Sequence, residues 1–311
     1  MALAKGSLGL ATCLGLLLVA GSASAFCRTT TCDVDSKQTG CTRDDNMCAT
    51  SGHPLFWPDN CSWFGVQKDG SPLRHITYDQ MHAAVTNAFT KWGNADCGSG
   101  AKPSFALQDT DVLYAPIECA QREFNKTAAN ANTWMFRDTD WPYVDSTSTI
   151  ALTTLSVEIS TGRILDADVE INSFRTNITT SDVNVVADLE SIVTHESGHF
   201  LGLAHSAVAT ATMYYSYSPS SVNIRTLDPD DELGICAAYP PGAAPICGQP
   251  EPIYGFSEQC GGADPVTGPD TAGDKKSSCA VSLGATSGSG ALGAGVVLAG
   301  AALVRRRRKT M

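Results

Sequence analysis

The clearest periodic pattern in the chain runs from Thr77 to Trp92. Its apolar residues recur three and four positions apart, as on one face of a helix of about four turns. These residues are Met81, Ala84, Val85, Ala88, Phe89 and Trp92. Thr77 is a typical N-cap residue, so we expect the helix to begin just after it. Weaker signals predict a second helix from about Asp188 to Leu201 and a last helix within 227–239.

Shorter runs of β-branched and aromatic residues predict strands. They cover Phe64–Gln67, Ser104–Gln108, Thr133–Arg137, Thr149–Ile159 and Ile164–Ile171. The turn Thr161-Gly162 precedes the last of these, which alternates between inward and outward positions. Strands and helices without an internal repeat predict an α+β core from about Phe64 to Tyr239.

The start of the chain carries an export signal. Lys5 precedes an apolar run over 8–20, and the small-residue pattern Ala23-Ser24-Ala25 follows. This order is typical of a signal peptide, which we assign to residues 1–25.

The end of the chain carries a second signal. Cys279 precedes an uncharged stretch over 280–304 and an arginine cluster at 305–308. The stretch is long enough to span a bilayer, and the arginines would hold its end on the cytoplasmic side. The arrangement resembles the C-terminal sorting tag of myxobacterial surface proteins, which implies a cut near the cysteine. A permanent transmembrane anchor is the alternative reading of this tag, residues 279–311.

Two further segments lack any periodicity. Residues 26–63 are rich in cysteine and predict a stapled, loop-rich extension. Residues 241–278 are rich in Pro, Gly, Ala and Ser and predict a linker. The core domain is therefore assigned to residues 64–240.

Cysteine usage supports export. Setting aside Cys13 in the signal and Cys279 in the tag leaves ten of the 12 cysteines, an even number that predicts disulfides. Five of the ten lie between Phe26 and Cys61, so at least one bridge must leave this cluster if all of them pair. We expect the pairs Cys97–Cys119 and Cys247–Cys260, although spacing alone does not fix connectivity.

The charge balance excludes one class of partner. The formal net charge is -11, whereas binding to nucleic acid needs a concentrated basic face. The two terminal signals, and not the charge, lead us to expect a secreted, cell-surface or outer-envelope protein that contacts a membrane through the C-terminal segment before processing.

The candidate chemistry is concentrated in HESGHFLGLAH at 195–205. His195 and His199 lie one turn apart on one helical face, so both can bind one metal ion, and Glu196 can reach a metal-bound water. Gly202 can adopt positive φ and turn the chain, which returns His205 as a third ligand. Three nitrogens leave one position for water, which marks a catalytic site, and imidazole ligands without redox chemistry favour zinc.

These eleven residues match the long zinc signature of the metzincin clan of metallopeptidases. Ser206, directly after the third ligand, resembles the matrixin branch. Other matrixin-like pieces are Thr212-Met213-Tyr214-Tyr215, which resembles the Met-turn, the helix over 77–92, the strand at 162–168, and DDELGI at 230–235 followed by Tyr239. The resemblance covers about Phe64 to Tyr239.

The resemblance implies a twisted five-stranded mixed sheet with three main helices and a zinc cleft between an upper and a lower subdomain. It implies a zinc-dependent endopeptidase whose peptide substrate lies extended along an edge strand, assigned to Ile150–Val157. Zinc would polarise the scissile carbonyl, and Glu196 would take the proton of the attacking water and deliver it to the leaving amine. Met213 would form an apolar floor below the histidines.

The chain departs from the matrixin pattern after the Met-turn methionine. Matrixins have Pro two residues later, whereas this chain has Tyr215, as do the astacin and serralysin branches, in which this tyrosine can approach the zinc. Tyr215 is therefore a candidate fifth ligand or oxyanion donor. Alternatively, Tyr215 lines the wall of the specificity pocket. Tyr217 is a further candidate for this wall. The cysteine-switch motif of matrixin propeptides is absent from the sequence.

An acidic cluster suggests a second cation. Asp166, Asp168 and Glu170 alternate along one strand and so share one face. Carboxylates in this arrangement suit calcium, with a plain solvated acidic face as the alternative.

Two other functions stay open. The chain could be an inactive zinc-binding surface interaction module, although the intact Glu196 argues against it. It could also be a metal-dependent hydrolase of a non-peptide substrate, which would cleave nothing in a peptide library.

Overall fold

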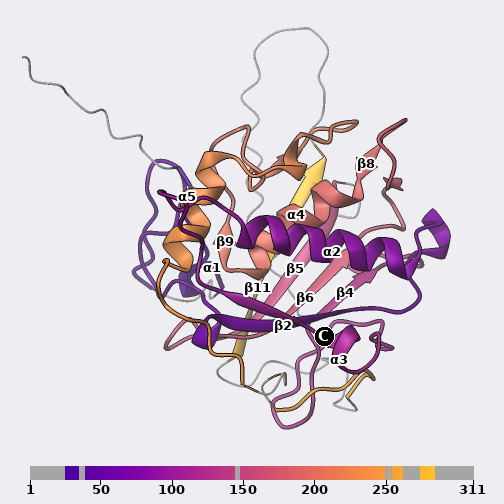
Figure 1. The fold of residues 1–311 in the computed structure, drawn as a ribbon, viewed down its shortest axis with the longest axis horizontal. Coiled ribbons are helices and arrows are strands. Elements are labelled where there is room, and N and C mark those ends of the chain that lie inside the picture. Colours follow the sequence, from indigo (N-terminus) through magenta and orange to yellow (C-terminus); the bar gives the residue numbers. More distant parts are fainter. Residues whose placement is uncertain are drawn as a thin grey trace, which may run out of the picture.

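A computed structural model gives the fold of the chain (Figure 1). It describes residues 25–34, 39–143, 148–248, 252 and 254–261, and the backbone of residues 274–283. The predicted signal peptide lies outside the described residues except for Ala25, and the predicted apolar span lies outside them except for 280–283. Within the described part of the chain, no helix is long and apolar enough to cross a bilayer.

The elements agree closely with the predicted ones. The helices are α1 (Thr31–Val34), α2 (Tyr78–Gly93), α3 (Thr110–Leu113), α4 (Leu189–Phe200) and α5 (Pro229–Ala238). The strands are β1 (Cys27–Arg28), β2 (Cys61–Val66), β3 (Ala106–Asp109), β4 (Thr133–Phe136), β5 (Thr149–Glu158), β6 (Ile164–Ile171), β7 (Ile178–Thr179), β8 (Ala187–Asp188), β9 (Leu203–Ala204), β10 (Ser216–Tyr217) and β11 (Asp274–Leu283). All five predicted strands are present, with ends displaced by at most three residues.

A mixed sheet forms the centre of the fold. Five strands lie in the order β3-β2-β4-β6-β5. β2, β3, β4 and β6 run parallel, whereas β5 runs antiparallel to β6. The predicted five-stranded mixed sheet of an α+β fold is thus confirmed. β11 and β10 continue the sheet beyond β5, so β5 is not the uncovered edge that we expected.

Helices α2 and α4 cover one face of this sheet (Figure 1). The six apolar residues predicted for the first helix are the residues that α2 buries. Its start is fixed by a capping box, because Thr77 Oγ1 accepts from Gln80 N and the Gln80 side chain accepts from Thr77 N. The main core lies between these two helices and the sheet.

The Cys-rich extension packs around the end of α4. β1 pairs antiparallel with β9, with Cys27 opposite Ala204. Thr29 N also donates to Gly202 O at 3.0 Å. The extension therefore contacts the loop that follows the zinc-signature helix. Its predicted boundary at 63/64 falls inside β2, which begins at Cys61.

All ten expected cysteines form disulfides. The pairs are Cys27–Cys48, Cys32–Cys41, Cys61–Cys247, Cys97–Cys236 and Cys119–Cys260. The expected bridge out of the N-terminal cluster is confirmed, but both pairs that we expected elsewhere are wrong. The bridges at Cys61, Cys97 and Cys119 instead join residues 186, 139 and 141 positions apart, which the fold and not the spacing brings together.

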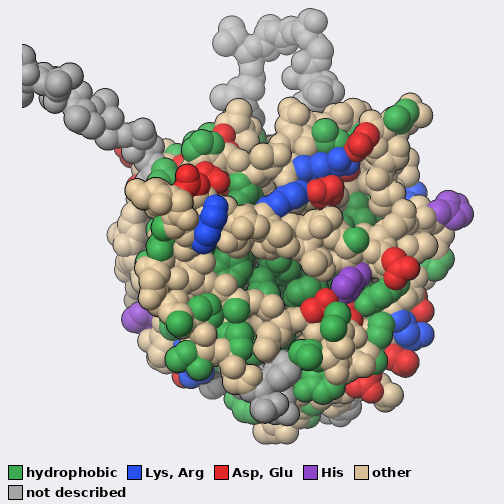
Figure 2. Space-filling view, viewed as in Figure 1, with side chains coloured by type: hydrophobic (Ala, Val, Ile, Leu, Met, Phe, Trp, Pro, Cys, Tyr) green, Lys and Arg blue, Asp and Glu red, His purple; other side chains and the backbone are tan. Residues whose placement is uncertain are grey.

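Charged side chains of both signs share the surface. On the face drawn in Figure 2, basic side chains lie among acidic ones instead of gathering in one basic patch. Lys91 pairs with Glu190, and Arg225 pairs with Asp182.

Candidate zinc centre and active site

Helix α4 carries the first two predicted metal ligands. Its N-cap Asp188 accepts a hydrogen bond from Ser191 N at 2.8 Å. His195 and His199 lie one turn apart on this helix, with their ring centroids 4.7 Å apart and both side chains fully buried.

A glycine turn brings the chain back to the helix. Gly202 has φ of +88°, which residues with a side chain rarely adopt. A Cβ built at this position would also lie 2.6 Å from Leu55 O. Both observations require glycine here. The chain then continues through β9 to His205, whose ring centroid lies 4.8 Å from that of His199.

The three imidazoles converge through the same ring atom. His199 Nε2 lies 3.1 Å from His195 Nε2 and 3.2 Å from His205 Nε2. Zn–N bonds of about 2.0–2.1 Å in tetrahedral geometry place two ligand nitrogens about 3.3 Å apart. The donor set and its spacing therefore fit one zinc ion, as the sequence predicted.

The opposite ring nitrogens are held by backbone carbonyls. His195 Nδ1 lies 2.6 Å from Thr212 O, and His199 Nδ1 lies 2.9 Å from Leu203 O. A carbonyl acceptor favours the Nδ1–H tautomer, which leaves the Nε2 lone pair for a metal. Burial lowers the pKa of His195 to about 4 and that of His199 well below its ordinary value. Both rings are thus neutral at pH 7, the form that binds metal.

The predicted proton acceptor, Glu196, lies between the helix and the sheet. Its side chain is fully buried, and Thr153 Oγ1 on β5 donates to its Oε2 at 2.5 Å. This contact connects the acid to the strand along which we expected the substrate. The sequence did not predict Thr153, because a threonine within a strand carries no signal for such a contact.

Met213 packs directly below the histidine-bearing helix. A Cβ built on Gly198 would lie 2.2 Å from Met213 Sδ and 2.8 Å from the Trp92 ring. The glycine between the two histidines is therefore needed for close packing. Met213 is 2% exposed, in agreement with the apolar floor that the family resemblance implied.

Helix α5 fixes the segment that carries Met213. The Asp231 carboxylate accepts from Thr212 N at 2.6 Å and from Met213 N at 3.0 Å. Because Thr212 O is the acceptor for His195, this carboxylate orients a predicted ligand through one intervening residue. Burial raises the pKa of Asp231 to about 6.

Comparisons with known proteins agree with this geometry. Residues 118–240 match the model of the matrixin family. This part of the chain is similar to the matrixins. The matched region contains β4, β5, β6, α4 and α5, together with all three histidines.

Plant relatives match a shorter part of the chain. Metalloendoproteinase 4-MMP of Arabidopsis thaliana is 45% identical over 56 residues, which is 18% of this chain and 16% of that protein. Metalloendoproteinase 1-MMP of Arabidopsis thaliana is 46% identical over 57 residues, 18% of this chain and 15% of that protein. Metalloendoproteinase 1 of Glycine max is 43% identical over 63 residues, 20% of each chain. The chain therefore spans a fifth or less of the length of these relatives.

The residue before Asp231 on α5 also holds the zinc-signature segment. Asp230 accepts a hydrogen bond at 2.6 Å from the hydroxyl of Ser206, which directly follows the third histidine. Asp230 Oδ1 also accepts from the backbone N of Ala25 at 2.8 Å and of Phe26 at 3.0 Å. Asp230 thus joins the backbone at Ala25 and Phe26 to the residue that follows the third histidine.

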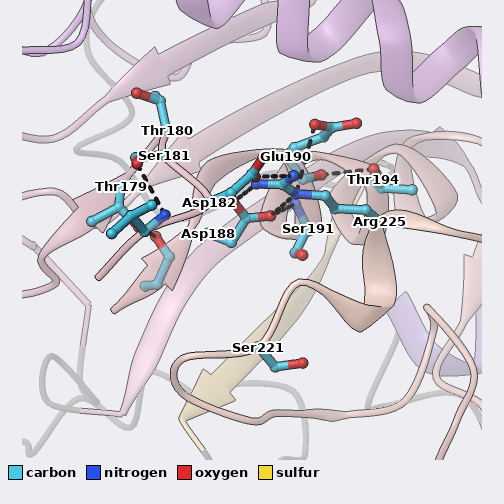
Figure 3. Close-up of polar contacts among 12 residues, drawn as sticks. Thr179, Thr180, Ser181, Asp182, Asp188, Glu190, Ser191, Thr194, Ser221 and Arg225 are labelled. Atoms are coloured by element: carbon cyan, nitrogen blue, oxygen red, sulfur yellow. Dashed lines mark hydrogen bonds and ion pairs between the residues drawn. The ribbon is translucent and has the colours of Figure 1, made fainter. Parts of the chain in front are cut away.

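Figure 3 shows how the N-terminus of α4 is held. Arg225 donates through Nε and Nη2 to the two carboxylate oxygens of buried Asp188, at 2.7 and 2.6 Å. Asp188 N donates to Tyr217 Oη at 2.9 Å, and Tyr217 Oη donates to Ser221 O at 2.6 Å. The Tyr217 hydroxyl, which we predicted to line the specificity pocket, is thus bonded to the helix cap. The sequence marks Asp188 as a helix start but carries no signal for Arg225, 37 residues later.

Tyr215 lies at the surface. Its side chain is 40% exposed, and its ring centroid lies 4.5 Å from that of Tyr214. Its action as a fifth ligand or oxyanion donor stays a prediction.

The predicted calcium ligands are buried. Asp166 and Asp168 are 2% and 1% exposed, so the alternative of a solvated acidic face is wrong. Asp168 accepts from Thr133 N and Glu123 N, each at 3.0 Å, and Glu170 pairs with Arg137. Burial raises the pKa of Asp168 to about 8. Asp168 and Glu170 thus have partners within the protein, and calcium binding stays a prediction.

Proposed function

We propose that this chain is an exported zinc-dependent endopeptidase. The observation that carries the proposal is the approach of three Nε2 atoms, two separations of which are 3.1 and 3.2 Å. The helix that holds two of these histidines also carries the buried Glu196. The matrixin match and the names of the plant metalloendoproteinases support the same activity.

Each residue of the centre has a proposed role. His195, His199 and His205 would hold the zinc ion, which supplies a Lewis acid for the scissile carbonyl and lowers the pKa of a water. Glu196 takes the proton of the attacking water and delivers it to the leaving amine. Thr153 orients the Glu196 carboxylate through the 2.5 Å hydrogen bond. Tyr215 is the candidate donor to the developing oxyanion.

The proposed substrate is a polypeptide in extended conformation. β5 lies at the end of the five-stranded sheet, and Thr153 connects it to Glu196. A peptide that adds to β5 as a further strand would gain main-chain hydrogen bonds along its length. Its scissile bond would then pass beside the proposed proton acceptor.

Export agrees with the disulfides and with the contact between Phe26 N and Asp230. Five disulfides are typical of an oxidising compartment, so we propose secretion or display at the cell surface after removal of residues 1–25. Cleavage after Ala25 would make Phe26 N an ammonium group. Its partner would be Asp230 Oδ1, which lies 3.0 Å away. Membrane contact through residues 279–311 before processing stays part of this proposal.

The test is the substitution Glu196→Gln. We expect it to keep zinc but to lower turnover of a peptide library by about 10²–10⁴-fold, because the proton acceptor is lost. Glu190→Gln is the matched control on the same helix and should cleave like the parent. Normal turnover in Glu196→Gln would overturn the role of this residue. A parent chain that binds zinc but cleaves no peptide would favour the interaction module, or, if it hydrolyses another class of substrate, the non-peptide hydrolase.

A further inference from the structure

Strand β11 occupies the side of β5 that faces away from the rest of the sheet. It pairs antiparallel with β5 from Asp274 opposite Glu158 to Ser282 opposite Thr149. Its last two residues pair in parallel with β10. In Figure 1, β11 runs beside β5 at the end of the sheet near α4. A segment from the far end of the chain thus lies where we propose that peptides bind.

The register places the middle of β11 level with the proposed proton acceptor. Cys279 lies opposite Thr153. Thr153 Oγ1 donates to Glu196 Oε2 at 2.5 Å. A substrate strand added to β5 would need the same N–H and C=O groups of β5 that β11 uses, because one side of a strand pairs with only one neighbour. The two strands therefore exclude each other.

The composition of residues 274–283 also differs from that of its surroundings. DKKSSCAVSL contains neither Gly nor Pro, whereas 261–273 and 284–295 are rich in Gly and the first of these also contains Pro. Every residue of β11 can therefore donate to a ladder. We expected this segment to belong partly to a linker and partly to the tag, and β11 runs across that predicted boundary at 278/279.

A short covalent tether keeps β11 near its place of binding. Cys260 is fixed to Cys119 by a disulfide, and only residues 261–273 separate it from β11. A short tether raises the effective concentration of an attached segment to the order of millimolar. Even a weakly binding strand would then compete well with a dilute substrate.

We propose that residues 274–283 are an intramolecular inhibitor that fills the peptide-binding edge of β5, and that the intact chain cleaves peptides slowly until this strand is displaced or cut away. The inference rests on the proposed function for its catalytic consequence. It names the occupant of the edge as a segment of the same chain, bound in extended form. A cut at 278/279 would leave only the first half of the strand in place.

The test is the double substitution Ser277→Pro and Ser278→Pro in the full chain. Alternate residues of a strand direct their N–H groups toward the same neighbour, so one of two successive prolines removes a hydrogen bond to β5. Ser277→Thr with Ser278→Thr is the matched control, because threonine keeps the N–H group and favours strands. We expect peptide cleavage to rise about tenfold in the proline variant and to stay unchanged in the control.

Hydrogen exchange gives a second measurement that does not depend on activity. β5 directs alternate amides toward β6 and toward β11, so alternate residues between Ala151 and Val157 should lose protection in the proline variant. The amides that face β6 should stay protected, which shows that the sheet is folded. A synthetic peptide of residues 274–283, added to the proline variant, should restore protection and inhibit cleavage competitively.

The outcomes separate this inference from the proposed function. If the protection changes as expected but no variant cleaves any peptide, the strand is a displaceable occupant and the peptidase assignment fails. If the parent cleaves peptides and the proline variant shows the same rate and the same β5 protection, residues 274–283 are not an inhibitor and the inference is overturned.

Discussion

The zinc centre and the edge of β5 are built from different kinds of contact. At the centre, buried hydrogen bonds form a chain. His195 Nδ1 is bonded to Thr212 O, and Thr212 N in turn donates to the Asp231 carboxylate. At the edge, a backbone ladder joins β5 to a strand from the end of the chain. The centre is therefore preorganised by buried side chains, whereas access to it depends on a pairing that another strand can replace. This contrast suggests that the catalytic geometry forms on folding and that regulation acts on the edge.

The largest effect is expected from Asp231→Ala, which removes the carboxylate that holds the segment below the histidines. The substitution leaves the buried N–H groups of Thr212 and Met213 without their acceptor, so we expect a loss of about 3–5 kcal/mol in the free energy of unfolding and weaker zinc binding. Denaturant unfolding and zinc titration measure the two effects. Glu232→Ala, at the next position of the same helix, is the control and should cost about 1 kcal/mol or less. Equal losses in both variants would show that the carboxylate does not anchor this segment.

A somewhat smaller loss should follow from Gly198→Ala. The new methyl group would meet Met213 Sδ at 2.2 Å and the Trp92 ring at 2.8 Å, so overpacking should cost about 1–3 kcal/mol of unfolding free energy. Met213→Ala removes the closest of these contacts. The double variant should therefore lose less stability than the sum of the two single variants, as measured by thermal or denaturant unfolding. Additive losses would mean that Met213 does not pack against α4 at Gly198.

Thr153→Val acts where the two regions meet. Losing the hydroxyl that holds Glu196 should lower kcat about tenfold, equivalent to about 1.4 kcal/mol, with zinc content and KM nearly unchanged. Thr153→Ser keeps the hydroxyl and should restore most of the rate. A drop in kcat that Ser does not restore would assign Thr153 to packing alone.

The last expected effect is a pH dependence of stability at Asp168, which is on β6. Burial raises the pKa of Asp168 to about 8, although the hydrogen bond from Thr133 N partly compensates. The folded chain therefore keeps this proton to higher pH than the unfolded chain does. This group should therefore reduce stability as the pH rises from about 4 to about 8. Unfolding midpoints at pH 5 and pH 8 should differ less in Asp168→Asn than in the parent. If calcium binds here, adding it at pH 8 should raise the midpoint of the parent and not that of the variant.

The sequence predicted those features that depend on neighbouring residues. The face of α2, its cap at Thr77 and the span of β6 all follow from periodicity and local capping. The spacing of the histidines within α4 and the turn at Gly202 gave the predicted ligand set for the same reason. These predictions required no knowledge of how distant segments pack.

Features that depend on distant segments were missed or wrong. Cys97 pairs with Cys236, which α5 brings to the end of α2, and not with the nearer cysteine that we expected. Thr153 reaches Glu196 only because β5 runs beside α4, and β11 was hidden within a segment assigned to a linker and a tag. No local pattern determines which strand will pair with which edge, because the pairing energy comes from the partner.

Zinc content, measured by elemental analysis of the purified full chain and of three single variants, tests the central claim most directly. We predict one zinc ion per parent chain, and much less in His195→Ala, His199→Ala and His205→Ala under the same dialysis. His82→Ala, which removes a histidine bonded to Asp109 elsewhere in the fold, should keep the full zinc content. One zinc ion retained in any of the three triad variants, or none in the parent, would contradict the account.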